Sequence, residues 1–254
     1  MLMCVIAAVL FSGCYDVYLT LDPEDIIYFN SNWGYDIESY YYDIKHGQSK
    51  YKKIDLAHKK VFDSVFEDIE IFGAKLCVPM KVSELPDKFE LYGYVSGDEY
   101  DLFAPDIEKV DESGWFPVSE IEPQGGRIIG GMEKYSLLLF YDNEIELASV
   151  KVICKEGQSI EDGIICRIDG YFPGQSLLLG GAVDIRSDIS EIKEFLGEGN
   201  EYLWGYYGDY LDLIYTDGDR VINLTYSIDG EDMNFVCADI ETVEMNILNT
   251  FNLY

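Results

Sequence analysis

The chain has 254 residues, and its 48 Asp and Glu against 18 Lys and Arg set a formal net charge of −30. This imbalance argues against nucleic acid as a partner, because affinity for phosphates comes from Lys and Arg that displace counterions. Binding to anionic lipid headgroups is disfavoured for the same reason, whereas cations and basic partners are favoured. The hydrophobic content of 48% is ample for a globular core.

The chain opens with an apolar segment, Met1–Phe11, that carries no charged residue. A membrane-spanning helix needs about 20 apolar residues, whereas roughly 7 to 15 is the length of the hydrophobic region of an export signal. The segment therefore predicts a signal peptide over residues 1–13. The alternative is a buried N-terminal strand or helix in which the cysteine that follows is incidental.

The end of this segment, Phe11-Ser12-Gly13-Cys14, resembles the lipobox of bacterial lipoproteins. The resemblance implies that Cys14 becomes the first residue of the mature chain and carries a thioether-linked diacylglycerol. At about 0.8 kcal/mol for each buried CH₂, two acyl chains hold a protein stably at a membrane. The expected location is the cell envelope, at the outer face of the bacterial cytoplasmic membrane.

The N-terminal segment of the body, residues 14–70, is expected to contain an amphipathic helix. Its apolar residues recur at helical spacing: Ile54, Ala57, His58, Val61, Phe62, Val65 and Phe66. Because His58 lies on this stripe, we expect it to be a core histidine rather than a ligand.

Two later regions, 71–157 and 158–254, are similar to each other and predict two tandem units. Each begins with a short helix, the first at Ser83 with Pro86 in its first turn, and the second at Asp188 with Glu191 as a capping box. Gly197 is expected to end the second helix.

An antiparallel hairpin follows the helix in each unit. YSLLLFYDNEIELASVKVI (135–153) parallels YLDLIYTDGDRVINLTYSI (210–228), and each contains an Asp-Asn or Asp-Gly turn signal between alternating strands. The second unit is expected to close with a helix that begins at Asp239. The predicted fold class is α+β, with two units of short helix and antiparallel meander.

These stretches carry a second resemblance. LCVPMKVSELP, a strand ending in Cys154, LLLGGAVDIRSDISEIKEFLGEGNE and LDLIYTDGDRVINLTYSI together resemble uncharacterised lipoproteins of clostridial-type Gram-positive bacteria, over roughly Ile71 to Asp229. The repeat is also similar in architecture to the tandem units of the beta-lactamase inhibitory protein. Neither resemblance supplies a catalytic motif, so together they imply an address and a fold.

The first unit holds an acidic insert, Gly97–Gly126, which is expected to be a long loop or a partly ordered flap. Its carboxylates could bind calcium weakly, although their spacing lacks the EF-hand pattern. A solvated acidic loop is the plainer interpretation, and neither a cofactor nor a dedicated metal site is expected. The acids are Asp98, Glu99, Asp101, Asp106, Glu108, Asp111 and Glu112.

Four cysteines lie in the body: Cys77, Cys154, Cys166 and Cys237. The chain has no CxxC pair and only two histidines, so a Cys/His zinc site is not expected. Cys154 and Cys166 flank a Gly-containing turn, so a disulfide could span the hairpin. The alternative, which is the commoner outcome, is that both are buried free thiols.

The residues indicate binding rather than catalysis. Only His46 and His58 could serve as a base for a Ser or Cys nucleophile, and no GxSxG occurs. The alternative is an envelope acid/base hydrolase that uses a pair of carboxylates, but with 48 acids the pair cannot be named.

An aromatic group beside a turn is the candidate recognition surface for a protein or glycan partner. It consists of Trp204, Tyr206, Tyr207 and Tyr210. Aromatic side chains dominate the energy of many recognition surfaces. Core packing and cross-strand pairs are the structural alternative. The sequence thus predicts a lipid-anchored envelope protein that works as a non-enzymatic binding module.

Overall fold

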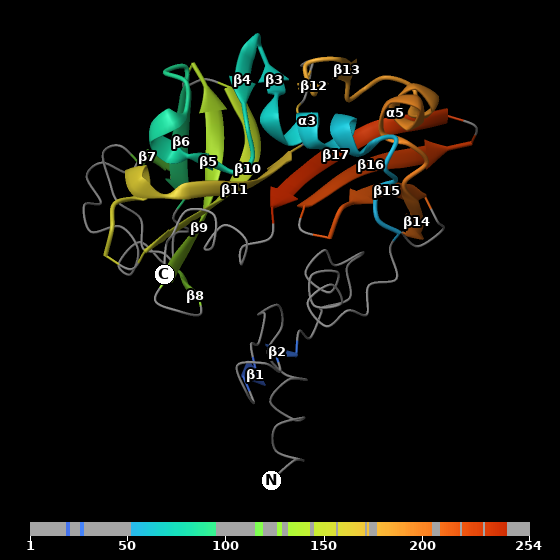
Figure 1. Cartoon of the computed structure of the whole chain (residues 1–254). Coiled ribbons are helices and arrows are strands. Elements are labelled where there is room, and N and C mark those ends of the chain that lie inside the picture. The colour runs from blue at the N-terminus through green and yellow to red at the C-terminus, as the bar shows by residue number, and fades with distance from the viewer. Residues whose placement is uncertain are drawn as a thin grey trace.

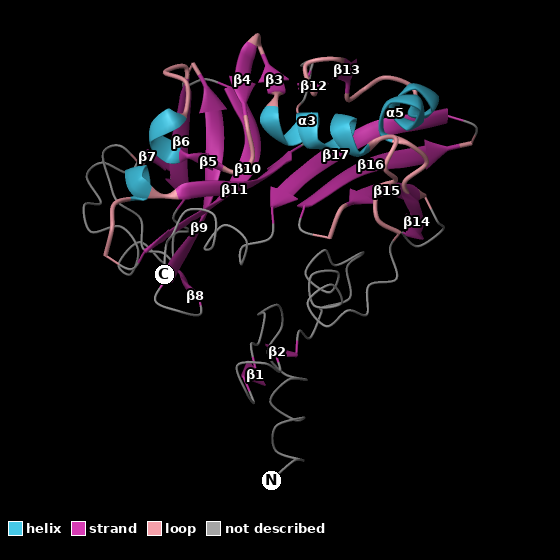
Figure 2. Ribbon diagram, viewed as in Figure 1, coloured by secondary structure: helices cyan, strands magenta, loops and turns pink. Residues whose placement is uncertain are grey.

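The computed structural model describes most of the body of the chain: residues 19–20, 26–27, 52–94, 115–118, 126–128, 132–142, 145–155, 157–170, 172, 177–204, 209–218, 220–230 and 232–242. Within these ranges the chain forms two α-helices and antiparallel β-sheets (Figure 1). Figure 2 shows that strands predominate. The fold is therefore α+β and mostly β.

An 11-stranded sheet is the framework of the molecule, and its neighbouring strands are all antiparallel. The strands follow one another across the sheet in this order: β14 (Asn200–Trp204), β15 (Tyr210–Thr216), β16 (Arg220–Asp229), β17 (Asp232–Thr242), β11 (Ile164–Gly170), β10 (Ile145–Lys155), β9 (Met132–Tyr141), β6 (Phe89–Tyr94) and β7 (Trp115–Pro117). Beside this path, β5 (Met80–Lys81) pairs with β11, and β8 (Gly126–Ile128) pairs with β9.

Both predicted hairpins are present, as β9–β10 and β15–β16. Alternation of apolar residues places one set of side chains on each face of the sheet, and the Asp-containing turns reverse the chain. The insert also contributes to the sheet, because β7 pairs with β6 and Phe116 is buried. The remaining residues between 97 and 125 lie outside the described part of the chain.

Two smaller sheets and two short 3-10 turns complete the described structure. A four-stranded sheet has the order β13 (Val183–Asp184), β12 (Leu177–Leu179), β3 (Ile69–Ile71) and β4 (Ala74–Leu76). A two-stranded sheet joins β1 (Leu19–Thr20) to β2 (Ile26–Ile27), and the 3-10 turns are η1 (Val82–Glu84) and η3 (Ile160–Asp162).

The second predicted helix is confirmed as α5 (Ile189–Leu196). Asp188 occupies the N-cap position, although its side chain makes no capping hydrogen bond, and Gly197 ends the helix with φ of +89°. Glycine suits this position because a positive φ is costly for other residues. Sequence pattern alone therefore located this helix, whereas the expected capping box did not form.

The other helix, α3 (Lys59–Glu67), begins later than the apolar stripe. Asp55 accepts hydrogen bonds from the backbone N–H and from Nδ1 of His58, both at 2.9 Å, and this turn precedes the first helical residue. The expectation of a core histidine was wrong, because His58 is the N-cap residue and its side chain is partly exposed.

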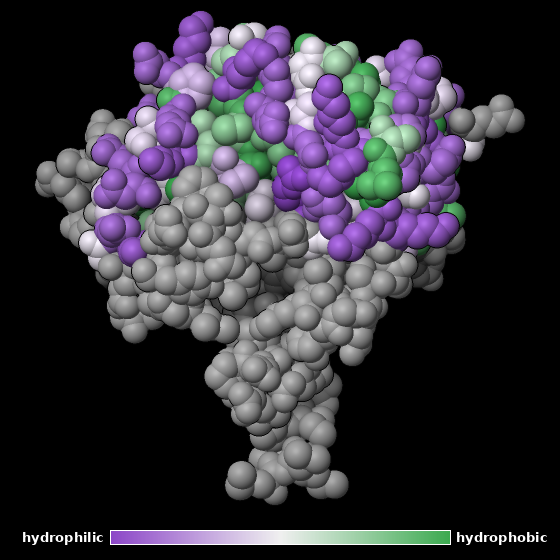
Figure 3. Space-filling model, viewed as in Figure 1, coloured by the Kyte–Doolittle hydropathy of each residue, from purple (hydrophilic) through white to green (hydrophobic). Residues whose placement is uncertain are grey.

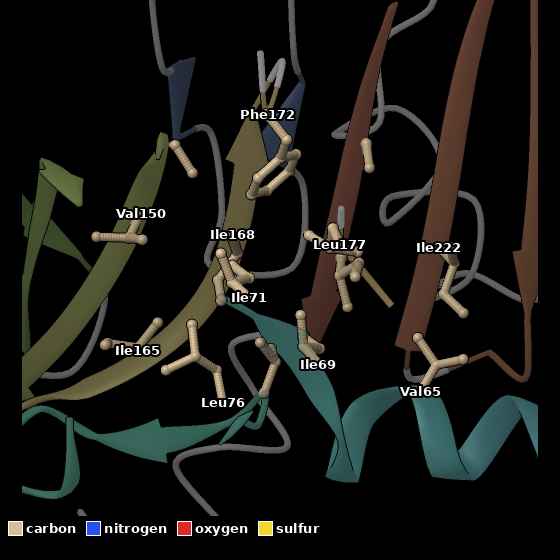
Figure 4. Packing of buried hydrophobic residues seen from close by; sticks show 14 of the residues in the cluster. Val65, Ile69, Ile71, Leu76, Val150, Ile165, Ile168, Phe172, Leu177 and Ile222 are labelled. Atoms are coloured by element: carbon tan, nitrogen blue, oxygen red, sulfur yellow. The ribbon is translucent and has the colours of Figure 1, made fainter. Parts of the chain in front are cut away.

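The helices and the four-stranded sheet lie on one face of the large sheet (Figure 1) and enclose the main core. In Figure 4, the side chain of Leu76 lies near that of Ile165, that of Ile71 near Ile168, and that of Val65 near Ile222. We call this covered side the core face, and the other side the outer face.

Two further expectations were wrong about local structure. Asp239 and Ile240 lie inside β17 and do not begin a C-terminal helix, because residues 237–241 alternate between faces as a strand requires. The helical turn in the first unit is η1, which ends at Glu84, so that Pro86 follows it instead of lying in its first turn.

The four cysteines of the described body are free thiols. Cys154 is buried in the core, whereas the Sγ of Cys166 lies 3.4 Å from the carbonyl oxygen of Lys151. In the β10–β11 register, Val152 is opposite Ile165, so Cys154 lies further along its strand and away from Cys166. The alternative of buried free thiols therefore describes this pair.

Candidate functional site

The predicted recognition surface lies at the end of the β14–β15 hairpin. Trp204 is the last residue of β14 and Tyr210 the first of β15, and the register places them directly opposite each other. Tyr210 is half-buried. Tyr206 and Tyr207 lie outside the described residues, as does Cys14, the predicted lipid attachment site.

Leu203 adds an apolar side chain to this end of the hairpin. It is 62% exposed, although its cross-strand partner Leu211 is buried in the core. β14 is the first strand in the order of the large sheet, at one edge of the described strands. Figure 3 shows hydrophobic patches lying between hydrophilic residues on the visible surface of the described structure. Leu203 is one of five large hydrophobic residues that are exposed among the described residues, with Leu56, Phe72, Ile145 and Met233.

A second candidate is a buried cluster of charges on the outer face, where β11 and β17 pair. Cross-strand pairs alternate there between the two faces: Ile168 and Ile240 belong to the core. Arg167 opposite Glu241, and Asp169 opposite Asp239, therefore share the outer face. We call these four residues the junction cluster.

Arg167 contacts all three carboxylates of the junction cluster. Its Nε and Nη2 donate to the two oxygens of Asp239, each at 2.7 Å, and Nη2 lies 3.2 Å from Asp169 Oδ2. Nε lies 3.5 Å from Glu241 Oε2. Only 8% of the Asp239 side chain and 2% of the Glu241 side chain are exposed. The cluster thus holds three acids and one guanidinium, of which Asp239 and Glu241 are buried and Asp169 is 40% exposed.

This imbalance shifts the pKa values of the cluster. Burial raises the pKa of Asp239 to about 7. The neighbouring Glu241 and Asp169 carboxylates add to this shift, whereas the positive charge of Arg167 opposes it. Desolvation opposes the charge on Arg167, but the attraction of Asp239 and Glu241 outweighs it and raises the pKa of the guanidinium. Asp239 could therefore exchange a proton near neutral pH, which is a property of general acids and bases.

The sequence analysis missed the junction cluster. A signal was present, because Arg167 and Asp169 are two residues apart in one apolar run, and Asp239 and Glu241 have the same spacing in another. That spacing puts both members of a pair on the same face of a strand. Assigning Asp239 to a helix start concealed the match.

No group of three or more His, Cys, Asp or Glu in the described ranges is arranged to hold a metal ion. The predicted calcium-binding acids of the insert lie outside those ranges. Among the described residues, no helix is long and apolar enough to cross a membrane.

No protein-family model, curated protein or solved structure matches the chain.

Proposed function

We propose that the chain is a lipid-anchored protein of the bacterial cell envelope that binds a protein or glycan partner and does not catalyse a reaction. The lipobox-like residues that end at Cys14 support the address. The observation that carries the binding role is the exposure of Leu203 beside the Trp204–Tyr210 pair, at an edge of the large sheet.

An exposed leucine at this position has an energetic cost that binding would remove. Full burial of such a side chain is worth about 1.5 to 3 kcal/mol. Sheet edges in soluble proteins are usually protected by charged side chains or proline against unwanted pairing. β14 carries the exposed charged residue Glu201, but Leu203, two positions further along, is apolar and exposed, which supports a partner that covers this end of the edge.

The order of the strands supports the finer proposal of two tandem units, predicted as residues 71–157 and 158–254, but with the boundary after β11 (Ile164–Gly170) and not at residue 157. Reading outward from the centre of the sheet, β17, β16, β15 and β14 occupy the same places as β11, β10, β9 and β6, and β7 is an additional strand beyond β6. The last strands of the two series in chain order, β17 and β11, pair with each other at the centre. A duplicated helix and meander, joined through its final strands, would produce this mirror order.

The binding role is tested by comparing Leu203→Lys with Met233→Lys, which changes an exposed residue of β17 in the same way. Both variants and the wild-type chain are purified from detergent-solubilised envelope, and the proteins and glycans that co-purify with each chain are identified. We expect one protein or glycan to accompany the wild type and Met233→Lys but not Leu203→Lys. Equal recovery with all three chains would argue against this surface.

The address is tested separately by mass spectrometry of the mature N-terminus. We expect the chain to begin at Cys14 with a diacylglycerol thioether, and a Cys14→Ser variant to lack the lipid mass. An intact N-terminus recovered from cytosol with an unmodified Cys14 would contradict the proposed location.

An acid/base hydrolase is the second candidate function, and the junction cluster is the observation that favours it. Asp239 has a raised pKa and lies with Glu241 and Asp169 around one arginine. We rank it second because Arg167 engages all three carboxylates, and Asp239 and Glu241 are buried. Hydrolysis of an envelope glycan by the wild type that disappears in Asp239→Asn, with folding unchanged, would reverse the ranking.

A further inference from the structure

The tip of the β3–β4 hairpin breaks a local rule of backbone geometry. Phe72 and Gly73 form the two-residue turn, and both have positive φ, +53° and +75°. Such turns prefer Asn or Asp followed by Gly, because a bulky residue with positive φ is strained. Backbone strain at an exposed aromatic residue is a pointer to function.

The ring of Phe72 is exposed yet held in place. It stacks on Tyr141 with a centroid distance of 4.3 Å, while 43% of the residue remains exposed. Tyr141 is fixed in turn by Phe89, whose ring meets it edge-on at 5.4 Å, and by its cross-strand neighbour Ile145. A rigid aromatic side chain loses little conformational freedom when it binds, which makes it an effective anchor.

Polar groups surround the aromatic stack. Lys88 Nζ donates to the Tyr141 hydroxyl at 3.2 Å and lies 5.4 Å from the centre of its ring. Asp142 holds the backbone of this corner through its N–H, which donates to the Lys88 carbonyl oxygen at 2.8 Å. Its carboxylate is 56% exposed and lies 4.0 Å from Lys88 Nζ, beyond hydrogen-bond distance.

The shape and charge of this corner indicate what would cover it. The tip of the β3–β4 hairpin is the uppermost part of the described structure in Figure 1. Because the stack on Tyr141 leaves 43% of Phe72 exposed, a partner that buries this residue must supply the concavity. The net charge of −30 favours basic groups around that concavity. At the tip itself, the exposed Asp142 carboxylate is offset by Lys88, whose side chain is 63% exposed. An anionic lipid surface would be repelled.

We propose that the tip of the β3–β4 hairpin is a protein-docking anchor, in which Phe72 enters an apolar pocket with a basic rim on a partner protein. This anchor is separate from the Leu203 edge of the sheet. If a partner bound only through the Leu203 edge, the proposed binding function would stand, but the proposal of an anchor at Phe72 would fail.

Site-specific photo-crosslinking in the producing cell tests the anchor. Phe72→p-benzoylphenylalanine is compared with Leu56→p-benzoylphenylalanine, because Leu56 is 94% exposed and lies outside the hairpin. We expect an adduct from position 72 alone, with attachment points on a protein that line an apolar pocket bordered by Lys or Arg. Identical adducts from both positions, or none from position 72, would overturn the proposal.

Phe72→Asn then separates binding from folding, because Asn followed by Gly suits this turn better than Phe. With the crosslinked partner purified, we expect affinity to fall at least about 30-fold, as for a hot-spot residue. The thermal midpoint should stay the same or rise. A midpoint lowered by several degrees with affinity retained would show that Phe72 serves packing only.

A flotation assay covers the lipid alternative. The wild-type body without its lipid is mixed with phosphatidylglycerol vesicles and with phosphatidylcholine vesicles. We expect it to remain with the unbound fraction in both cases. Flotation that depends on Phe72 would assign the hairpin tip to a membrane surface and overturn the protein-docking proposal.

Discussion

Two arginines organise charge in this molecule in opposite ways. Arg167, in the junction cluster, contacts three carboxylates on the outer face of the sheet. Arg220, at the start of β16, contacts Asp217 at 2.7 Å and also Asp63 of α3, and Lys59 lies 3.4 Å from Asp217. The first group has an excess of two negative charges, whereas the second has two charges of each sign.

Whether acids and cations balance in number determines what a buried group of charges does for the fold. Arg220 also lies over the rings of Phe66 and Phe62, 4.8 and 5.4 Å from their centres, so it joins the β15–β16 hairpin to α3 by packing as well as charge. Its cluster is balanced and serves as a structural contact. The junction cluster is unbalanced and buried, and it should make the stability of the fold depend on pH.

The largest expected effect comes from Arg167→Met, which would leave Asp239 and Glu241 buried without their cation. Breaking a buried ion pair by removing one partner costs about 3 to 5 kcal/mol. We expect a loss of that size in the free energy of unfolding at pH 8, measured by urea denaturation. The loss should be smaller at pH 5, because protonated acids need no cation, and an equal loss at both pH values would contradict this account.

The next effect is the pH dependence that Asp239 contributes. Its folded pKa of about 7 lies above the ordinary value of 3.8, so between these pH values the folded state binds more protons than the unfolded state. This contribution to stability is fully present below about pH 4 and is lost as pH rises through 7. In urea denaturation, Asp239→Asn should reduce the difference in unfolding free energy between pH 5 and pH 8 by about 2 kcal/mol.

Asp232→Asn is the matched control for this measurement. It removes one negative charge from the same strand at an exposed position, so it reproduces the change in net charge without altering the junction cluster. We expect its pH dependence to follow the wild type. If Asp232→Asn flattened the curve as much as Asp239→Asn, the effect would belong to the overall charge of the protein.

A smaller loss is expected for Arg220→Met, because Lys59 remains beside both acids and a methionine can still contact the two rings. We expect about 1 to 2 kcal/mol from the lost charge-assisted hydrogen bonds. Burial opposes ionisation of Asp63, but hydrogen bonds from Lys59 and Arg220 lower its pKa. The stability from this contact is present above about pH 4 and lost in acid, so the wild type and the variant should converge there.

The sequence predicted the elements whose local pattern of apolar and turn residues agrees with the burial and pairing seen in the structure. α5 combined an apolar helical face with a terminal glycine, and the β9–β10 and β15–β16 hairpins combined alternation with turn residues. At the recognition surface, the sequence located the hairpin and its Trp204–Tyr210 end. It could not reveal the exposure of Leu203, because exposure depends on which strand forms the edge.

Elements that depend on distant partners were the ones missed. Asp239 resembles a helix cap when read alone, and only pairing with β11 places it opposite Asp169 and beside Arg167. The same holds for Phe72, whose strained turn is stabilised by Tyr141, 69 positions further along the chain. Contacts between residues far apart in sequence follow from topology, which a single sequence specifies only indirectly.

The smallest expected effect extends the comparison to uncharged groups. Tyr215 and Tyr226 are both buried on the core face, but Tyr215 donates to the Gly197 carbonyl oxygen at 3.2 Å, whereas the Tyr226 hydroxyl has no hydrogen-bond partner among the described residues. Tyr215→Phe should cost about 1 kcal/mol, because the carbonyl oxygen of Gly197, the C-cap residue of α5, loses its donor. Tyr226→Phe should change the unfolding free energy by less than about 0.5 kcal/mol or increase it, because it removes a desolvated hydroxyl. Thermal denaturation of the two variants side by side measures the difference, and a larger loss for Tyr226→Phe would mean that its hydroxyl has a partner in solution.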